Sequence, residues 1–263
     1  MVFVCIFFLA MGSFSSVMIY RLGKIETEKD EKINLFFPRS HCPHCKKQIL
    51  LTNLIPLIGF IRQLGKCKNC REPISLIYPF TELLHLVIGI LIIYFFEISL
   101  LSITIYAIFF VLYILFILDL EFFYLPIGLN VFLGILGIAS NSVFSLFIDN
   151  TNIYNLSSSS LSIIGCLSGF LSLWTVNFTY RLIAKKDGIG GGDFILFGGL
   201  GSIVGPFELA PILFLGSISA LLIVLTNLKK YSNEVPLGSG LILGFIFYVL
   251  VKYFELLPNM LVI

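Results

Sequence analysis

Two aspartates stand beside long uncharged stretches of the chain. Asp119 follows the apolar run 103–118, and Asp193 follows a glycine-rich segment and precedes another apolar run. An ionisable group at the edge of a membrane-spanning stretch is costly to bury, which makes it a functional candidate. Two carboxyl groups that share a site repel each other, so one ionises while the other keeps its proton. Such a pair can hydrolyse an amide, because one member activates water and the other hydrogen-bonds or protonates the carbonyl.

We therefore predict that Asp119 and Asp193 form a catalytic pair. The glycines just before Asp193 (Gly190, Gly191 and Gly192) would let a substrate strand approach the backbone closely and would permit unusual dihedral angles. The residues alone leave a second interpretation open. Both aspartates could be solvated at the membrane interface, with Asp193 favoured by the positive end of its helix and the glycines acting as a hinge.

Four cysteines form two CxxC pairs in the segment between the first two apolar stretches. They are Cys42, Cys45, Cys67 and Cys70. Two such pairs can place four thiolates tetrahedrally around one zinc ion. We expect a structural site, because four cysteine ligands leave no position for water or substrate, and a metal supplies stability that a small segment lacks. His41 and His44 are alternative ligands, although each is expected at the surface.

The elements that must position these residues are apolar. Of the 263 residues, 58% are hydrophobic and 12% are charged, about half the charged fraction of a soluble domain. Apolar stretches of about 20 residues can each cross a bilayer, and in lipid they must be helical to satisfy their backbone. A soluble core would need polar faces at helical spacing, which the sequence lacks. We predict an all-α polytopic membrane protein with about eight spans, at 2–20, 77–96, 100–118, 127–148, 160–180, 194–206, 209–227 and 238–257.

Lysine and arginine predict the orientation of these spans. All but six of the 17 basic residues lie in 21–71, and basic loops stay in the cytoplasm. The cysteine segment should then be cytoplasmic and reduced, which disfavours disulfides there. Asp119 and Asp193 fall at the cytoplasmic ends of their spans, and Lys252 falls near an outer end, where its stem could snorkel. Because orientation explains the basic segment and the net charge is only +2, no nucleic-acid partner is expected.

The order of these features resembles the prepilin peptidases, or type IV leader peptidases, of the GxGD aspartyl protease group. The resemblance covers nearly the whole chain. A GxGD match by itself is weak, whereas the ordered set is specific. The matching motifs are Gly12-Ser13-Phe14 with Ile19-Tyr20-Arg21-Leu22, Pro38-Arg39-Ser40-His41-Cys42-Pro43-His44-Cys45, Asn53-Leu54-Ile55-Pro56, Ile74-Ser75-Leu76-Ile77-Tyr78-Pro79-Phe80-Thr81-Glu82, Asp119 with Leu125-Pro126, Gly190-Gly191-Gly192-Asp193, and Pro236-Leu237-Gly238.

The resemblance implies an aspartic endopeptidase that removes the short basic leader of type IV prepilin or pseudopilin precursors. It implies cleavage at the cytoplasmic face of the inner (plasma) membrane, in contact with lipid, with Asp119 and Asp193 as the catalytic residues. It also implies methylation of the new N-terminus with S-adenosylmethionine. Glu82 matches an acidic family position that could bear on methylation, although a solvated or capping role is equally consistent. The expected domains are a first transmembrane helix (1–20), a zinc-knuckle insert (21–76) and a membrane-embedded aspartyl protease domain (77–263).

Four positions depart from the family pattern. Ile127 replaces the aspartate of an LPD motif, Ile195 stands where lysine is usual, Ser16 stands where asparagine is common, and Leu22 lacks a following proline. Three alternatives remain: a peptidase without methyltransferase activity, a non-catalytic membrane assembly factor that docks through the zinc knuckle, or a transporter whose acids bind cations. The transporter is disfavoured because both acids lie at one interface and the sequence has no internal repeat.

Overall fold

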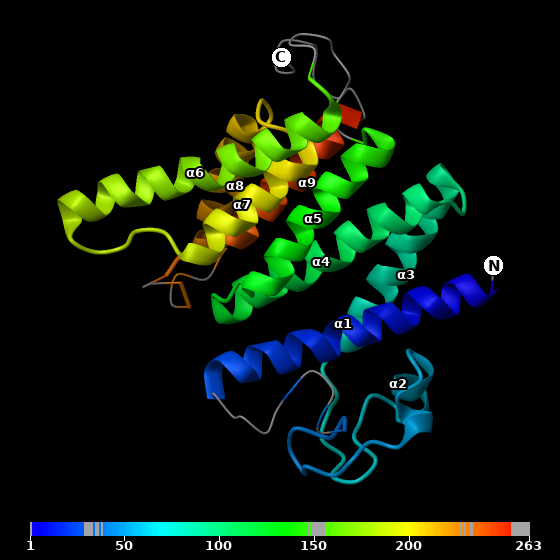
Figure 1. Cartoon of the computed structure of the whole chain (residues 1–263). Helices are drawn as coiled ribbons and strands as arrows, with labels where there is room; N and C mark the ends of the chain where they lie inside the picture. Colours follow the sequence, from blue (N-terminus) through cyan, green and yellow to red (C-terminus); the bar gives the residue numbers. More distant parts are fainter. Residues whose placement is uncertain are drawn as a thin grey trace. The chain divides into compact units, whose positions relative to one another are not determined.

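The computed structural model describes residues 2–28, 34, 37, 39–146, 148, 156–226, 228, 230–231 and 234–253. Within these residues the chain is helical and has no β-strand beyond two isolated β-bridges, which confirms the expected all-α class. The chain divides into two compact units, Met1–Tyr106 and Ala107–Ile263, called unit 1 and unit 2 below. Figure 1 follows the helices of each unit along the sequence.

Unit 1 holds the first helices and the cysteine insert. Its elements are α1 (Val2–Glu28), the 3-10 helix η1 (Leu51–Asn53), α2 (Ile58–Arg62), α3 (Ile77–Phe96) and the beginning of α4 (Leu100–Phe122). Unit 2 holds the rest of α4 and five further helices. These are α5 (Ile127–Phe144), α6 (Ser158–Ala184), α7 (Gly191–Val204), α8 (Leu209–Thr226) and α9 (Leu237–Tyr253).

Six of these helices, α1, α3, α4, α5, α6 and α8, are long and apolar enough to cross a membrane. Together with the shorter apolar helices α7 and α9, they correspond to the eight expected stretches, although the end of the last, 254–257, lies outside the described residues. α1 continues to Glu28 rather than ending at residue 20. Hydropathy marks where lipid ends, whereas Arg, Lys and Glu beyond that point are good helix formers and prolong the helix.

Unit 1 is built on close contact between α1 and α3. Gly12 has no room for a side chain, because a Cβ there would lie 2.7 Å from the Cα of Glu82. The same interface buries His85, whose Nε2 lies 3.2 Å from Ser15 Oγ and whose Nδ1 lies 2.9 Å from the hydroxyl of Tyr106. Both ring nitrogens therefore have polar partners inside a predicted span, as buried imidazoles require.

Unit 2 is organised around α7, which is buried along most of its length and packs against α5 and α6. Glycines set these contacts. A Cβ at Gly137 of α5 would lie 2.0 Å from Ser202 Oγ, and one at Gly165 of α6 would lie 2.1 Å from the carbonyl oxygen of Gly201. Small residues at such positions let membrane helices approach closely, which increases their dispersion contacts.

A helix as short as α7 needs partners for its terminal carbonyl groups, because lipid offers none. Asn141 Nδ2 of α5 donates to the carbonyls of Ser202 (2.9 Å) and Ile203 (2.7 Å), and the Ser162 hydroxyl of α6 also donates to Ser202. Gly205, at φ 87°, then reverses the chain. The neighbouring helices therefore complete α7 and allow it to end within the unit.

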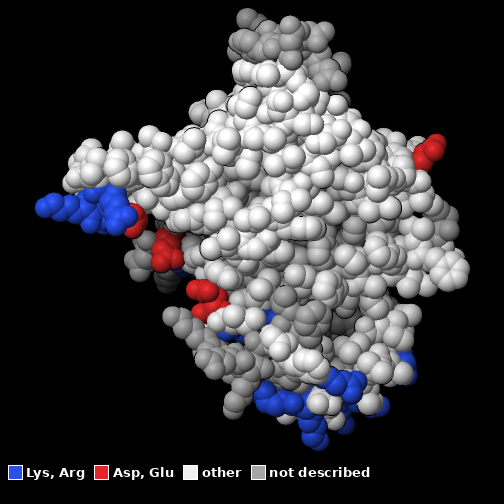
Figure 2. Space-filling model, in the orientation of Figure 1, with Lys and Arg blue, Asp and Glu red and all other residues white. Residues whose placement is uncertain are grey.

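Charged side chains lie at the ends of the apolar helices of unit 2. Figure 2 shows Lys and Arg gathered at the end of α6, whose last turn contains Arg181 and which is followed by Lys185 and Lys186. Lys252 pairs with Glu208 through a 3.0 Å Nζ–Oε1 contact, and Tyr248 also hydrogen-bonds Glu208. Lys252, which is expected near the outer end of its span, therefore has an ion-pair partner within the protein.

Candidate active site and candidate metal centre

Asp119 lies near the end of α4 and is almost completely buried, with 5% of its surface exposed. Its Oδ2 accepts a hydrogen bond from the backbone N–H of Ser239 (2.5 Å) and lies 2.8 Å from the Ser239 hydroxyl. Ser239 is in the first turn of α9, where backbone N–H groups have no partner within their own helix. The N-terminus of α9 therefore holds the Asp119 carboxylate in place and favours its negative charge.

Asp193 lies in the first turn of α7 and is also buried, with 8% exposed. Its backbone N–H donates to the carbonyl of Gly190 at 3.1 Å. Among the described residues its Oδ1 has no hydrogen-bond partner, and the same holds for Oδ1 of Asn130 on α5. Asn130 Nδ2 lies 3.4 Å from the carbonyl oxygen of Gly192, so both unpartnered oxygens belong to one buried region around the start of α7. Unpaired buried oxygens of this kind are positions for water or a substrate donor.

Leu125 connects the two aspartates. A Cβ at Gly192 would lie 2.7 Å from Leu125 Cβ, and one at Gly238 would lie 2.7 Å from Leu125 Cδ1 and 3.1 Å from Asp119 Cγ. The fold thus brings the two aspartates, from α4 and α7, to one end of unit 2.

The glycine segment before Asp193 differs from its expected conformation. Gly191 and Gly192 already belong to α7, and Gly190 precedes them with an ordinary extended backbone (φ −68°, ψ 144°). The prediction of unusual dihedral angles at these glycines is therefore wrong. Gly192 packs against Leu125, which leaves no room there for a side chain, whereas a Cβ at Gly191 would meet nothing within 4 Å. Gly191 and Gly192 have ordinary helical angles because they form the first turn of α7.

Asn177 of α6 holds the loop that leads to Asp193. Its Oδ1 accepts hydrogen bonds from the N–H groups of Gly188 (2.8 Å) and Ile189 (3.0 Å), and its Nδ2 donates to Asp187 Oδ1 at 3.2 Å. A buried amide that makes three hydrogen bonds to one loop fixes its path. Asn177 therefore determines how the chain enters α7.

The four cysteines form the candidate metal centre. All four Sγ atoms lie within 4.8 Å of one another, and those of Cys42 and Cys70 are 3.8 Å apart. A tetrahedron with Zn–S bonds of about 2.3 Å has sulfur–sulfur edges of about 3.8 Å. The donor set and its spacing therefore fit zinc. No histidine belongs to this cluster in the described part of the chain; His41 Nδ1 instead lies 3.1 Å from the carbonyl oxygen of Arg39.

The two CxxC pairs form nearly identical turns. In the first, Cys42 N–H donates to Lys47 O (3.0 Å) and Lys46 N–H donates to Cys42 O (2.9 Å). In the second, Cys67 N–H donates to Glu72 O (2.8 Å) and Arg71 N–H donates to Cys67 O (2.9 Å). Lys46 and Arg71, four residues after the first cysteine of each pair, share a left-handed backbone.

The second turn also favours a thiolate. Hydrogen bonds from the backbone N–H groups of Cys70 and Asn69 lower the pKa of Cys67 to about 6. A thiol with such a pKa is largely ionised at neutral pH, which is the form that binds metal.

Three residues at these sites, Ser239, Asn130 and Asn177, were missed by sequence reasoning. Ser239 directly follows the Pro236-Leu237-Gly238 motif, so the position of that motif could have identified Ser239 as a candidate site residue. Asn130 and Asn177 are polar residues inside apolar stretches, and a buried amide there needs a partner. Their partners lie far along the chain, so only the fold could identify them.

Comparisons with known proteins identify the relatives of this chain. Residues 6–96 match the bacterial peptidase A24 N-terminal domain, and residues 106–225 match the type IV leader peptidase family. Three similar proteins carry the name prepilin leader peptidase/N-methyltransferase. The Legionella pneumophila protein is 32% identical, and the match covers 91% of this chain and 89% of that protein. The Klebsiella pneumoniae protein is 34% identical, with 81% of this chain and 88% of that protein covered. The Vibrio cholerae protein is 31% identical, with 90% of this chain and 91% of that protein covered. No solved structure matches. The chain belongs to the type IV leader peptidase family.

Proposed function

We propose that this protein is a prepilin leader peptidase and N-methyltransferase in which Asp119 and Asp193 carry out peptide hydrolysis. The observation that carries the proposal is the meeting of these two buried aspartates, from helices distant in sequence, at one end of unit 2. The names of the similar proteins support the reaction and the substrate, a prepilin or pseudopilin precursor.

The two aspartates act as a unit in hydrolysis. One carboxylate takes a proton from a water molecule, whose oxygen then bonds to the scissile carbonyl carbon. The other carboxyl group hydrogen-bonds the carbonyl oxygen, and the C–N bond breaks as the departing amine takes up a proton. A coupled pair titrates together, so neither role is assigned to one residue.

The surroundings of the pair suit these roles differently. Asp119 is held by two hydrogen bonds from Ser239, whereas Oδ1 of Asp193 is buried and lacks a partner among the described residues. Oriented groups in a buried site lower the barrier because they need not reorganise during the reaction. Ser239 and Asn177 are therefore positioning residues, and Asn177 acts through the loop that it holds.

The protein is further proposed to lie in the inner membrane with its cysteine insert and both aspartates on the cytoplasmic side. The basic residues of 21–71 support this orientation. A substrate with a basic leader and a hydrophobic helix would then lie in the same bilayer, with the junction between these two parts at the depth of the aspartates. Lipid surrounds the apolar helices in this arrangement.

Zinc is the proposed occupant of the cysteine cluster, held by Cys42, Cys45, Cys67 and Cys70 in a structural role. S-adenosylmethionine, when bound, would supply a methyl group for the substrate amine. The pilin N-terminus produced by cleavage is the amine that this second reaction consumes.

The test is leader cleavage of a prepilin by purified protein in detergent. Asp119→Asn and Asp193→Asn each remove an acid at nearly constant size, and each should lower the rate at least about 1000-fold, as losing one member of a catalytic unit does. Glu121→Gln is the control. Glu121 is on the same helix as Asp119 but is exposed and pairs with Lys230 at 3.0 Å, so this variant should cleave normally.

Each outcome distinguishes one function from another. Cleavage by both aspartate variants at the wild-type rate would exclude the proposed mechanism. A wild-type protein that is folded, contains zinc and yet cleaves none of several prepilins would indicate a non-catalytic assembly factor instead.

A further inference from the structure

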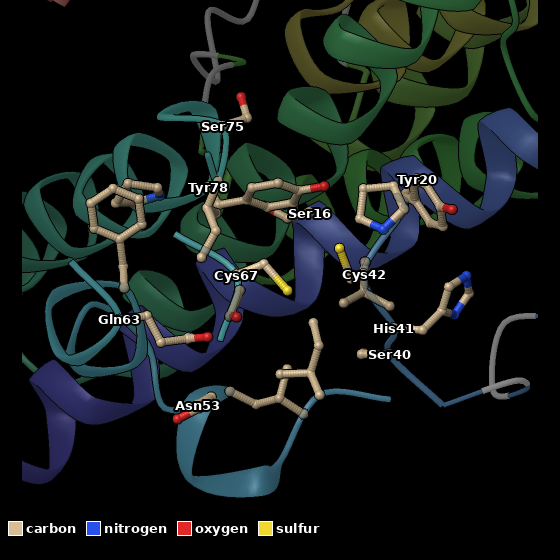
Figure 3. Close-up of a pocket in the computed structure, with 18 of the residues that line it drawn as sticks. Ser16, Tyr20, Ser40, His41, Cys42, Asn53, Gln63, Cys67, Ser75 and Tyr78 are labelled. Carbon is tan, nitrogen blue, oxygen red and sulfur yellow. The ribbon is translucent and has the colours of Figure 1, made fainter. Parts of the chain in front are cut away.

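A cavity of about 360 Å³ lies within unit 1, and neither Asp119 nor Asp193 is among the residues that line it. Its walls come from α1, from the cysteine insert and from the start of α3. Figure 3 shows Ser16 and Tyr20 of α1, Tyr78 of α3, and Cys42 and Cys67 of the insert around this hollow. The volume is within the range of sites for small ligands, about 300–1,000 Å³. The peptidase chemistry described above uses none of these groups.

Two buried charged groups of opposite sign line the cavity. Glu82 and Arg21 are each only 7% exposed. Arg21 Nη1 donates to the carbonyl of Asn34 at 3.1 Å, which fixes the guanidinium beside the cavity. Charged groups that border a hollow can also serve a molecule bound there, so this pair of opposite charges suits a polar ligand that carries both donors and a carboxylate.

Glu82 is held in place by an unusual backbone. Its Oε2 accepts a hydrogen bond from the N–H of Leu57 at 2.8 Å, and Leu57 itself has a left-handed φ of 57°. A branched residue in that conformation costs about 1–3 kcal/mol, and such strain persists where the surroundings require it. The insert therefore bends to present its backbone to Glu82. The sequence left open whether Glu82 is solvated; the structure shows that it is buried.

Aromatic rings complete the lining. Tyr20 of α1 and Tyr78 in the first turn of α3 both face the cavity. The cavity thus combines flat rings, a carboxylate and a guanidinium. A nucleoside joined to an amino acid requires this combination: rings stack on a purine, a carboxylate accepts hydrogen bonds from ribose hydroxyls, and a guanidinium pairs with the amino-acid carboxylate.

We propose that this cavity is the S-adenosylmethionine site of the protein. Tyr78 stacks on the adenine, Glu82 accepts hydrogen bonds from the ribose, and Arg21 pairs with the carboxylate of the methionine part. This inference rests on the methyltransferase half of the proposed function and assigns that reaction to unit 1. Because Cys42 and Cys67 also line the cavity, the metal cluster maintains one of its walls.

The first experiment maps the site directly. Purified full-length protein in detergent is irradiated with tritiated S-adenosylmethionine, and the labelled peptides are identified by mass spectrometry. We expect labelling within 13–21, 53–57 or 72–82, and competition by unlabelled S-adenosylhomocysteine. Labelling confined to unit 2 would overturn the assignment.

The second experiment measures binding without turnover, by equilibrium dialysis of the same radioligand. Hydrogen bonds to a charged group contribute about 1.5–3 kcal/mol, so Glu82→Gln should weaken binding at least about tenfold. Tyr78→Ala should weaken binding by about tenfold, whereas Tyr78→Phe, which keeps the ring, should restore most of the affinity. The controls are Glu97→Gln and Tyr94→Ala, which change the same residue types on α3 or at its end but outside the cavity.

The outcomes separate this inference from the proposed function. Wild-type affinity in both Glu82→Gln and Tyr78→Ala would overturn the site, even if the protein methylates. If the wild type cleaves leaders but binds no S-adenosylmethionine, the site and the methyltransferase activity are both wrong while the peptidase stands. Loss of cleavage in the aspartate variants, with S-adenosylmethionine binding intact, would support the division between the two units.

Discussion

The cysteine cluster of unit 1 and the two aspartates of unit 2 are held by different kinds of structure. The cysteines lie on two short turns whose hydrogen bonds connect residues at most nine positions apart, such as Cys42 to Lys47 and Cys67 to Glu72. The aspartates lie on helices whose partners are far along the chain: Ser239 for Asp119 and Asn130 for the start of α7. The first site is built from local turns and has a donor set that fits a metal, and the second depends on helix packing.

This difference has consequences for how each site fails. A metal centre contributes its stability through one cluster, so the loss of one ligand removes most of it. A packed helix bundle spreads its stability over many contacts, so single changes have graded effects that depend on the space around each residue. The four predictions below test this contrast, in order of decreasing expected effect.

Removing the metal should have the largest effect, and only in unit 1. Structural zinc contributes roughly 10 kcal/mol or more to small metal domains. Cys67→Ser should therefore abolish zinc binding, measured by elemental analysis, and should make 39–75 sensitive to limited proteolysis. Cys166→Ser, a cysteine outside the cluster, should keep the full zinc content. If Cys67→Ser kept its zinc and its protease resistance, the insert would not depend on a metal held by the four cysteines.

Filling the helix contacts of unit 2 should have the next largest effect. At Gly137 a Cβ would clash with Ser202 and with the backbone of Ile203, whereas at Gly128, also on α5, it would meet nothing within 4 Å. Overpacking costs about 1–3 kcal/mol or more, so Gly137→Ala should lower the unfolding temperature by several degrees. Gly128→Ala should leave it unchanged or raise it slightly. Equal unfolding temperatures for the two variants would show that close packing does not position α7.

The loop before Asp193 should be the next most sensitive feature. Asn177→Ala removes three hydrogen bonds from the loop, and a misplacement of about 1 Å at a reacting group can cost about 100-fold. We expect leader cleavage to fall about 10–100-fold, mainly in kcat, with zinc content unchanged. Thr179→Ala, on the exposed side of the same helix, should cleave normally. An unchanged kcat in Asn177→Ala would remove Asn177 from the positioning residues.

The smallest of these effects should come from Ser239→Ala. The variant loses the hydroxyl contact with Asp119 but keeps the 2.5 Å hydrogen bond from the backbone N–H. A hydrogen bond of this kind contributes about 1 kcal/mol, so kcat for cleavage should fall about fivefold. Ser217→Ala, which changes an exposed serine on α8, is the control. A loss as large as that of Asp119→Asn would mean that the hydroxyl contacts the substrate or the water itself.

The sequence by itself determined the helical membrane class, the two CxxC pairs, and the candidacy of Asp119 and Asp193. These features follow from local properties: hydropathy over about 20 residues, ligand spacing within a turn, and the cost of a charge next to lipid. The cysteine cluster then formed as its spacing predicted, because each turn is closed by its own hydrogen bonds.

Only the tertiary structure decided what surrounds those residues. It completed the short helix α7 with Asn141 and Ser162, held Asp119 with Ser239, and buried Glu82 and Arg21 at one cavity. It also gave the glycines before Asp193 a helical rather than an unusual conformation. Such partners are set by how helices pack, and a linear pattern does not state which polar group meets which across tens of residues. Burial then makes each of these contacts necessary, because a polar group without water must find its partner within the protein.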